Sequence, residues 1–276
     1  MSSTSALRID SLSFTHSGGR DYNEDSLAEC EAFGAVRIFM LADGAGGQGG
    51  GDVASKLAVV AAREVFLGLP VFSPETLRLC MEKADEAICA KQKSEPRLSQ
   101  MASTFVALLV NYERGQALVG NLGDSRCYIF RGGEVIGQSY DHSLVQRFVD
   151  AGLYPLEKLR EHPRRNVLYA SLGANSEDIP PFTTQFPIDL QPGDAALLCS
   201  DGVWELLDDA TLAELASTSE TLEDWHDRLQ SLVERSMPLG HDNYSAILVK
   251  AYVSDKDQNS DQELSTVRPL VSNKLR

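Results

Sequence analysis

An α+β fold built around antiparallel sheets is the fold class that this sequence predicts. Two pairs of helical segments are separated by short apolar segments, and several of these are joined by turns too short for a parallel crossover. The chain has 276 residues, enough for one large or two small domains. Its 43% apolar and 24% charged residues are ordinary for a globular protein with a sizeable core.

The first part of the chain predicts two strands followed by two helices. Residues 7–14 alternate between apolar and polar as a strand does, and residues 36–42 form a second, more apolar strand. A helical pattern then begins with Asp52 as its expected N-cap. A second helix opens at Ser73-Pro74 and continues towards Lys91, because Ser is a good cap and Pro suits the first turn.

Two hairpins are predicted next. The first joins residues 103–110 to residues 116–119 through a polar turn. The second joins residues 126–131 to residues 134–137 through Gly132-Gly133, a very short turn. Such connections place consecutive strands antiparallel.

The remaining elements complete the pattern. Residues 142–172 are expected to be helical or irregular, since prolines interrupt them, and residues 182–188 and 195–200 are expected to be strands. Helical patterns return between residues 209 and 235, and residues 244–253 form a last strand.

Residues 1–253 are expected to form one domain, because no repeat or linker interrupts them, and the polar residues 254–276 are expected to be a disordered tail. The net charge of −15 argues against nucleic-acid and anionic-membrane partners. No segment has the apolar length of a membrane span or the pattern of a secretory signal.

The cysteines form no CxxC pair and lie mostly in apolar segments, which indicates buried free thiols in a cytoplasmic protein. They are Cys30, Cys80, Cys89, Cys127 and Cys199.

Three aspartates stand where an apolar run meets a turn: Asp43, Asp201 and Asp242. A single aspartate at such a place is usually a turn residue, because its side chain hydrogen-bonds the nearby backbone. Three of them, far apart in sequence, indicate strand ends that converge on a hard cation.

The glycine-rich stretch after Asp43 also offers a different interpretation. Residues 44–49 match the GxGxxG pattern of dinucleotide-binding proteins, with Glu64 about twenty residues further on. That fold needs a parallel strand after the first helix, whereas here a second helix and hairpins follow. The context therefore disfavours a nicotinamide cofactor.

Six motifs occur in an order that resembles one family. They are Arg20-x-x-Asn23-Glu24-Asp25, Asp43-Gly44-x-Gly46-Gly47-x-x-x-Gly51-Asp52-x-Ala54-Ser55, Ser103-Thr104, Gly123-Asp124-Ser125-Arg126, Ser200-Asp201-Gly202 and Asp242-Asn243. Over about residues 7–253 the chain resembles the PPM (type 2C) metal-dependent Ser/Thr protein phosphatases. Residues 141–144 and 162–168 resemble the bacterial branch of that family.

The resemblance implies a four-layer αββα sandwich, with two central antiparallel sheets flanked by helix pairs. It implies that Asp43 bridges two cations and that Asp201 and Asp242 complete one metal shell. Glu24 and the Gly44 carbonyl would hold the second ion, and Asp124 would offer a weaker third site with Asp201.

Carboxylate and carbonyl ligands without His or Cys favour Mg²⁺ or Mn²⁺ over Zn²⁺. Two such ions activate a bridging water as hydroxide, which would hydrolyse phosphoserine or phosphothreonine by direct attack on phosphorus. Arg20 would grip the phosphate with its planar donors.

One position departs from many relatives, which carry His directly after the Asp-Gly pair to protonate the leaving alcohol. Here that residue is Ala45, so the proton would come from metal-bound or bulk water or from another residue. His16, His142 and His241 are candidates by proximity in sequence. An ordinary turn or surface position is the expectation for each of these histidines.

Residues 142–172 correspond to a flap beside the site in bacterial relatives. This segment carries Arg160, Arg164 and Arg165, which are expected on a solvated helix face, and we hypothesise that the flap tunes substrate choice.

The resemblance implies phosphorylated protein substrates, an opposing Ser/Thr kinase and a monomeric enzyme. The alternative is a pseudophosphatase, in which the same fold serves as a regulatory binding module. The presence of Glu24, Asp43, Asp201 and Asp242 together favours the enzyme.

Overall fold

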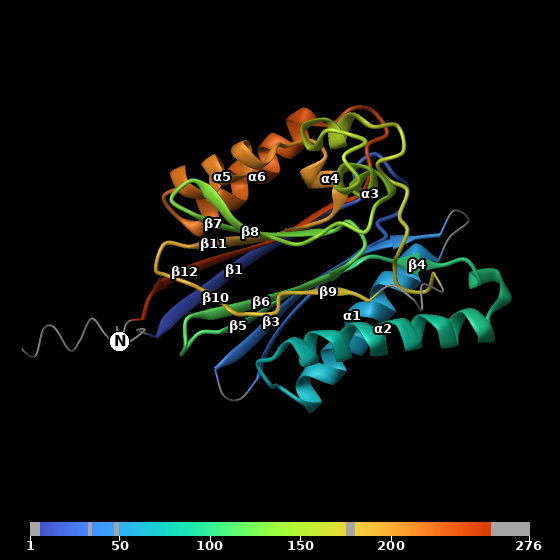
Figure 1. Ribbon diagram of the computed structural model, residues 1–276, viewed down its shortest axis with the longest axis horizontal. Coiled ribbons are helices and arrows are strands. Elements are labelled where there is room, and N and C mark those ends of the chain that lie inside the picture. The colour runs from blue at the N-terminus through green and yellow to red at the C-terminus, as the bar shows by residue number, and fades with distance from the viewer. Residues whose placement is uncertain (1–5, 33–34, 47–49, 175–179, 255–276) are drawn as a thin grey trace, which may run out of the picture.

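Two antiparallel sheets lie face to face with helices on their outer faces in the computed structural model, which describes residues 6–32, 35–46, 50–174 and 180–254 (Figure 1). Every pair of neighbouring strands in the described residues is antiparallel. The predicted αββα sandwich is therefore confirmed, and the parallel sheet of a dinucleotide-binding fold is excluded for these strands.

The first sheet has five strands and is covered by two helices (Figure 1). Its order is β1 (Leu7–His16), β12 (Tyr244–Val253), β11 (Ala195–Cys199), β7 (Arg126–Arg131) and β8 (Glu134–Gln138). The covering helices are α5 (Asp209–Thr218) and α6 (Leu222–Ser236).

The second sheet lies against the other helix pair, α1 (Gly51–Gly68) and α2 (Pro74–Ser94), which the short 3₁₀ helix η1 (Pro96–Leu98) follows. Its order is β10 (Ile188–Asp189), β6 (Gln116–Leu122), β5 (Phe105–Asn111), β3 (Val36–Ala45) and β2 (Asp25–Ala32). Two short strands join it at the side: β4 (Ala102–Ser103) pairs with β3, and β9 (Phe182–Thr183) pairs with β6.

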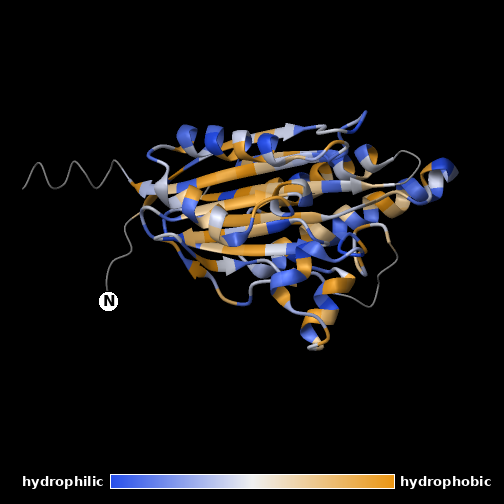
Figure 2. Ribbon diagram, turned by 90° about the horizontal axis from the view of Figure 1, so that it is seen from above, coloured by the Kyte–Doolittle hydropathy of each residue, from blue (hydrophilic) through white to orange (hydrophobic). Residues whose placement is uncertain are grey.

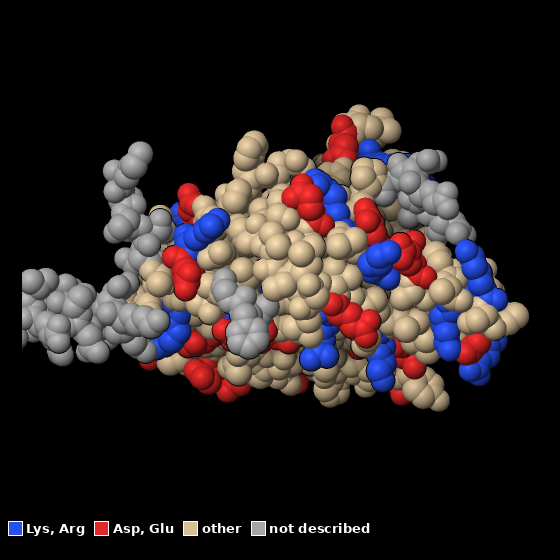
Figure 3. Space-filling model, turned by 90° about the horizontal axis from the view of Figure 1, so that it is seen from below, with Lys and Arg blue, Asp and Glu red and all other residues tan. Residues whose placement is uncertain are grey.

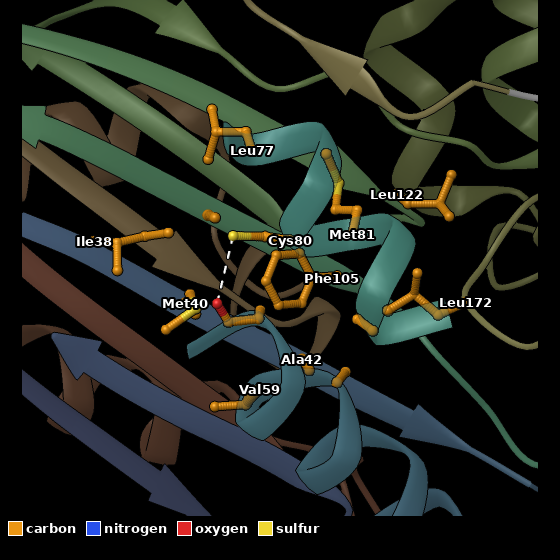
Figure 4. Close-up of a cluster of buried hydrophobic side chains, with 14 of the residues drawn as sticks. Ile38, Met40, Ala42, Val59, Leu77, Cys80, Met81, Phe105, Leu122 and Leu172 are labelled. Atoms are coloured by element: carbon orange, nitrogen blue, oxygen red, sulfur yellow. Dashed lines mark hydrogen bonds between the residues drawn. The ribbon is translucent and has the colours of Figure 1, made fainter. Parts of the chain in front are cut away.

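Three buried clusters fill the three spaces between the four layers. The cluster between the second sheet and its helices includes Met40, Cys80 and Phe105 (Figure 4). In it the Cys80 thiol donates to the Ala62 carbonyl at 3.4 Å, and burial raises the pKa of this thiol to about 12. Cys30, Cys80, Cys127 and Cys199 are buried free thiols, as predicted, whereas Cys89 is only partly buried.

The other two clusters are equally apolar. Leu41 and Leu198 belong to the cluster between the sheets, and Phe130 and Trp225 belong to the one between the first sheet and its helices. The strands are accordingly mostly hydrophobic while the helices alternate in character (Figure 2). Burying these faces is the main favourable term in folding, because it removes apolar surface from water.

The two long helices begin differently. Ser73 caps α2 as predicted, since its Oγ accepts a hydrogen bond from the backbone N–H of Thr76 at 3.2 Å. The N-cap of α1 is Gly50 rather than the predicted Asp52, which lies in the first turn. Gly50 has φ of 111°, a left-handed conformation that favours glycine.

Strand β2 has no counterpart in the prediction, which assigns no helix or strand between residues 14 and 36. It is an edge strand rich in Asp, Ala and Glu, which have low strand propensity. Its conformation comes from pairing with β3, where Asp25 lies opposite Asp43.

One further expectation needs correction. Residues 182–188 form two short strands instead of one, because Pro187 lacks a backbone donor where the ladder would continue. The turn at Asp124 joins β6 to β7, which belong to different sheets, and so carries the chain across the sandwich.

The segment 142–172 packs near the end of the sandwich where α4 (Asp201–Trp204) begins (Figure 1). It contains α3 (Leu144–Asp150) and the 3₁₀ helix η2 (Leu156–Glu161), and a β-bridge between Ser143 and Leu168 closes it. It is thus helical and irregular, as predicted.

The surface is mixed in charge on the face of α1 and α2, where basic and acidic side chains are interspersed around an uncharged centre (Figure 3). Among the described helices, none has the length and apolarity needed to cross a membrane. Residues 255–276, predicted as a tail, lie outside the described residues, as do residues 47–49 of the glycine-rich stretch.

Candidate active site

Four aspartates from both sheets come together at one end of the sandwich. Asp25 begins β2 and lies opposite Asp43 of β3. Asp201 is the first residue of α4, directly after β11, and Asp124 lies in the turn from β6 to β7. The charges of Asp25, Asp124 and Asp201 each act on Asp43, as expected for carboxylates that face one another.

The sheets are joined at this point by a hydroxyl group. The Oγ of Ser200 donates to Oδ2 of Asp25 at 3.0 Å and accepts from the backbone N–H of Ser245 at 3.0 Å. Because Ser200 precedes Asp201, this contact holds Asp201 of the first sheet against Asp25 of the second.

Glu24 and Gly44 are brought together by backbone contacts. The Gly44 N–H donates to the Glu24 carbonyl at 3.1 Å, and the Glu24 N–H donates to Oδ1 of Asn243 at 2.8 Å. A Cβ atom on Gly44 would lie only 2.0 Å from the carbonyl oxygen of Gly51, so this close approach requires glycine. Burial is the main cause that raises the pKa of Glu24.

Asp242 lies beside these residues, just before β12, and is paired with Arg20. Nη2 of Arg20 donates to Oδ2 of Asp242 at 2.8 Å, and both side chains are partly exposed. Asn243 fixes the adjoining loop, since its Nδ2 donates to the carbonyls of Ser17 and Tyr22, each at 2.9 Å. The structure thus brings together all seven predicted site residues.

The electrostatics of this cluster disfavour ionised carboxylates. Burial, followed by the charges of neighbouring carboxylates, raises the pKa of Asp43 and of Asp201 well above the ordinary range. Burial likewise raises the pKa of Asp25 to about 6 and that of Asp124 to about 7. Ionising these carboxyl groups therefore costs free energy, because each is buried and close to others of the same sign.

Two buried oxygens of the cluster, Oδ1 of Asp25 and Oδ1 of Asp201, have no hydrogen-bond partner. Buried acceptors are nearly always paired in native proteins, so such an oxygen indicates a missing partner. Among the described residues, no group of three Asp, Glu, His or Cys side chains is placed to hold a metal ion. The oxygen-only donor set and the two unpartnered oxygens nevertheless fit a hard divalent cation.

Trp204 and Arg126 form the support behind the site. Nε1 of Trp204 donates to the Asp124 carbonyl at 2.9 Å, and the Arg126 guanidinium lies 3.6 Å from the centre of the Trp204 ring. Arg126 also forms a buried ion pair with Asp141, with a shortest contact of 2.7 Å. Trp204 is thus buried behind the site.

The hydroxyls of Ser103 and Thr104 satisfy backbone groups. Oγ of Ser103 donates to the Asp43 carbonyl at 2.9 Å, and Oγ1 of Thr104 accepts from the Asp43 N–H at 3.0 Å. Both contacts fix the backbone of Asp43 and leave its carboxylate for the cluster.

The three histidines occupy different environments. His16 is exposed and stacks on Tyr244, as expected for a surface residue. His241 is partly buried, and its Nε2 lies 2.8 Å from the Gly202 carbonyl. His142 is buried against Gly123 and has a lowered pKa because of that burial, so the expected surface position is wrong for it.

Arg160 and Arg165 are not on a freely solvated helix face, whereas Arg164 is exposed, in a turn. Arg160 pairs with Asp209 at 2.7 Å and also donates to the Trp204 carbonyl at 2.8 Å. Arg165 pairs with Glu205 at 2.6 Å. Both contacts hold the segment against α4 and the residues that follow it.

Two acidic residues near the site were missed by the analysis of the sequence. Asp25 stands inside the Asn23-Glu24-Asp25 motif, so its position next to Glu24 was the available signal. Glu205 follows Asp201 by four residues on the same helical turn, and its charge raises the pKa of Asp201. No feature of the sequence separates Glu205 from an ordinary surface glutamate.

A two-sheet sandwich with clustered carboxylates and an arginine at one end defines a class: the phosphohydrolases of the PPM type. The family model of protein phosphatase 2C matches residues 15–241. The chain therefore belongs to this family, and within it to the bacterial PPM-type Ser/Thr protein phosphatases.

Known relatives cover nearly the whole chain. The serine/threonine phosphatase stp of Listeria innocua is 30% identical over 87% of this chain and 95% of its own length. The catalytic domain of the phosphatase PstP, solved with two manganese ions, superposes with a TM-score of 0.74 and 29% identity, covering 89% of this chain and 99% of that one.

A third relative is PppA of Pseudomonas aeruginosa, described as a key regulatory component of the T6SS. It superposes with a TM-score of 0.71 and 30% identity, covering 90% of this chain and all of that one.

Proposed function

We propose that this chain hydrolyses phosphoserine and phosphothreonine in proteins with the help of two divalent cations, Mn²⁺ or Mg²⁺. The observation that carries the proposal is the cluster of buried carboxylates, whose two unpartnered oxygens belong to Asp25 and Asp201. Buried negative charge without a counter-charge is costly, and a bound cation relieves that cost.

The residues expected to hold the ions are those that the structure brings together at this end of the sandwich. Asp43 would contact both ions, since it faces acids from both sheets. Asp201 and Asp242 would complete one shell, and Glu24 with the Gly44 carbonyl would hold the other ion. Asp124 would take part in a weaker third site.

When bound, two such ions supply an activated water and positive charge beside the phosphoryl oxygens. Asp25 would help to orient this water. Its Oδ2 is fixed by the Ser200 hydroxyl at 3.0 Å, and its Oδ1 has no partner in the protein. The PstP catalytic domain, which contains two manganese ions, supports the number and kind of ions.

Arg20 is the residue expected to bind the phosphate. A guanidinium has five N–H donors, and the contact with Asp242 at 2.8 Å uses one of them. The side chain is 56% exposed, so a phosphoryl group can reach the remaining donors from solvent. Charge-assisted bonds of this kind are stronger than neutral ones.

The substrates would be phosphoproteins, and a Ser/Thr kinase would produce them. The proposal extends to the segment 142–172 as a flap, whose contacts from Arg160 to Asp209 and from Arg165 to Glu205 support a coupling with the site.

The direct test is release of phosphate from phosphoserine peptides by the purified chain with Mn²⁺ or Mg²⁺, with and without a chelator. We expect hydrolysis that the chelator abolishes and that Asp201→Asn does not support. Metal-independent hydrolysis, or none with either ion, would refute the proposal in favour of a binding module with the same fold.

A further inference from the structure

Two large apolar side chains are exposed beside the candidate phosphate-binding residue. Tyr22 is 80% exposed on the loop between β1 and β2, and Leu239 is fully exposed on the loop between α6 and β12. A single exposed apolar residue needs no explanation, because much of any protein surface is apolar. Tyr22 and Leu239 are significant because they lie on the two loops that carry Arg20 and Asp242.

The two loops are packed tightly against each other. The Gly19 N–H donates to the His241 carbonyl at 2.9 Å, and a Cβ atom on Gly19 would lie 2.7 Å from Cα of Gly240. The amide of Asn243 also donates to the Tyr22 carbonyl at 2.9 Å. The backbone beneath both exposed side chains is therefore held in place before any ligand arrives.

The Arg20–Asp242 pair connects the same two loops that carry Tyr22 and Leu239. Arg20 precedes Tyr22 by two residues, Asp242 follows Leu239 by three, and their side chains meet at 2.8 Å. Consecutive Cα atoms of a polypeptide are 3.8 Å apart. A phosphorylated residue bound at Arg20 thus carries its sequence neighbours past Tyr22 or Leu239.

We propose that Tyr22 and Leu239 form an apolar rim that binds the residues flanking the phosphorylated side chain. The favoured substrates are then phosphoprotein segments with a large apolar side chain next to the phosphoserine or phosphothreonine. This inference rests on the proposed function. It adds a preference for apolar neighbours of the phosphorylated residue, which neither the metal cluster nor Arg20 can recognise.

A polypeptide segment suits this rim better than a second folded surface does. The rim consists of two separate side chains around a charged pair, so its apolar area is small. One or two side chains of an extended segment would cover an area of that size. The free energy gained from such a contact is proportional to the apolar area that it buries.

The test compares three substrates at saturating Mn²⁺. They are a phosphoserine peptide with Leu or Phe on both sides, the same peptide with Gly on both sides, and N-acetyl-phosphoserine methylamide, which has no neighbouring side chains. The variants are Tyr22→Ala, Leu239→Ala and the double variant. The matched control is Phe186→Ala, because Phe186 is 83% exposed between β9 and β10, across the second sheet from β2.

We expect the wild type to prefer the Leu- or Phe-flanked peptide over the Gly-flanked one in kcat/KM. Each rim variant should lower this preference by about tenfold, mostly through KM, from the loss of one apolar contact. Tyr22→Phe and Phe186→Ala should keep it.

Equal kcat/KM of the wild type for both peptides would overturn the rim while leaving the proposed function intact. An equal loss on all three substrates would also overturn it, because the variants would then act on Arg20 and not on the flanking residues. Failure of the wild type to hydrolyse any of the three would refute the proposed function itself, and the rim with it.

Discussion

Two buried acidic regions lie close together in this molecule and differ in whether a protein cation balances their carboxylates. Asp141 accepts hydrogen bonds from Nε of Arg126 at 3.0 Å and from Nη2 at 2.7 Å, so its charge is matched inside the protein. Asp43 and Asp201 face further carboxylates, and their pKa values are raised because of burial and those neighbours. One region is electrostatically complete, and the other is not.

The difference separates a structural role from a ligand-binding one. Arg126 also donates to the Tyr128 hydroxyl at 2.9 Å and stacks on Trp204, so the ion pair ties β7 to α4 beneath the site. In the carboxylate cluster Asp25 accepts a hydrogen bond from Ser200, but Asp43 and Asp201 face further carboxylates. The unmatched charge of this cluster costs stability, which is characteristic of functional sites that a ligand completes.

The largest expected effect comes from removing a charge of the incomplete region. Asp201→Asn should lower phosphopeptide hydrolysis by about 10³-fold or more, worth about 4 kcal/mol in transition-state stabilisation, because a metal ligand is lost. Phosphate release with Mn²⁺ measures this effect. The exposed Asp227→Asn on α6 is the control, and activity within a few fold of wild type in Asp201→Asn would remove Asp201 from the site.

Removing a charge from the buried Arg126–Asp141 pair should lower the stability of the fold. Asp141→Asn leaves the buried Arg126 without a counter-charge, so the free energy of unfolding should fall by about 3–5 kcal/mol in urea denaturation. Replacing both partners, as Arg126→Met with Asp141→Leu, should cost much less. A loss below about 1 kcal/mol in Asp141→Asn would mean that the pair is not structural.

The pH dependence of the metal-free protein tests the incomplete region as a whole. Asp25 and Asp124 have an ordinary pKa of 3.8, and burial raises it to about 6 and about 7 in the fold. Between these values the folded state binds more protons than the unfolded state. The free energy of unfolding should therefore fall by a few kcal/mol as the pH rises from about 4 to about 7.

Urea denaturation in EDTA at pH 4.5, 6 and 7.5 measures this trend, and Mn²⁺ should restore stability at pH 7.5 by mass action. A metal-free protein that becomes more stable towards pH 7 would contradict the assigned crowding of carboxylates.

The smallest expected effect is a change in the free energy of unfolding that has opposite signs in the two regions. Asp43→Asn should raise the free energy of unfolding of the metal-free protein at pH 7.5 by about 1 kcal/mol, because it removes a carboxyl group whose raised pKa opposes folding at this pH. The exposed Glu157→Gln serves as the control and should change it by less. Destabilisation by Asp43→Asn would show that this carboxylate supports the fold in the way Asp141 does.

Much of the fold could be predicted from local sequence. The strand 244–253 and the Ser73 cap were placed correctly, because alternation and capping depend on residues that are neighbours in the chain. The β2 strand was not predicted, since residues of low strand propensity adopt that conformation only through pairing with β3.

The sequence by itself determined the order of the helices and strands, the family motifs, and the identity of the acids that could bind a cation. Only the tertiary structure decided which carboxylates are matched. Asp141 lies opposite Arg126 and is neutralised, whereas Asp25 meets Asp43 across a strand register and is not. The physical reason is that charge compensation depends on distances between segments remote in sequence, and no local pattern encodes those distances.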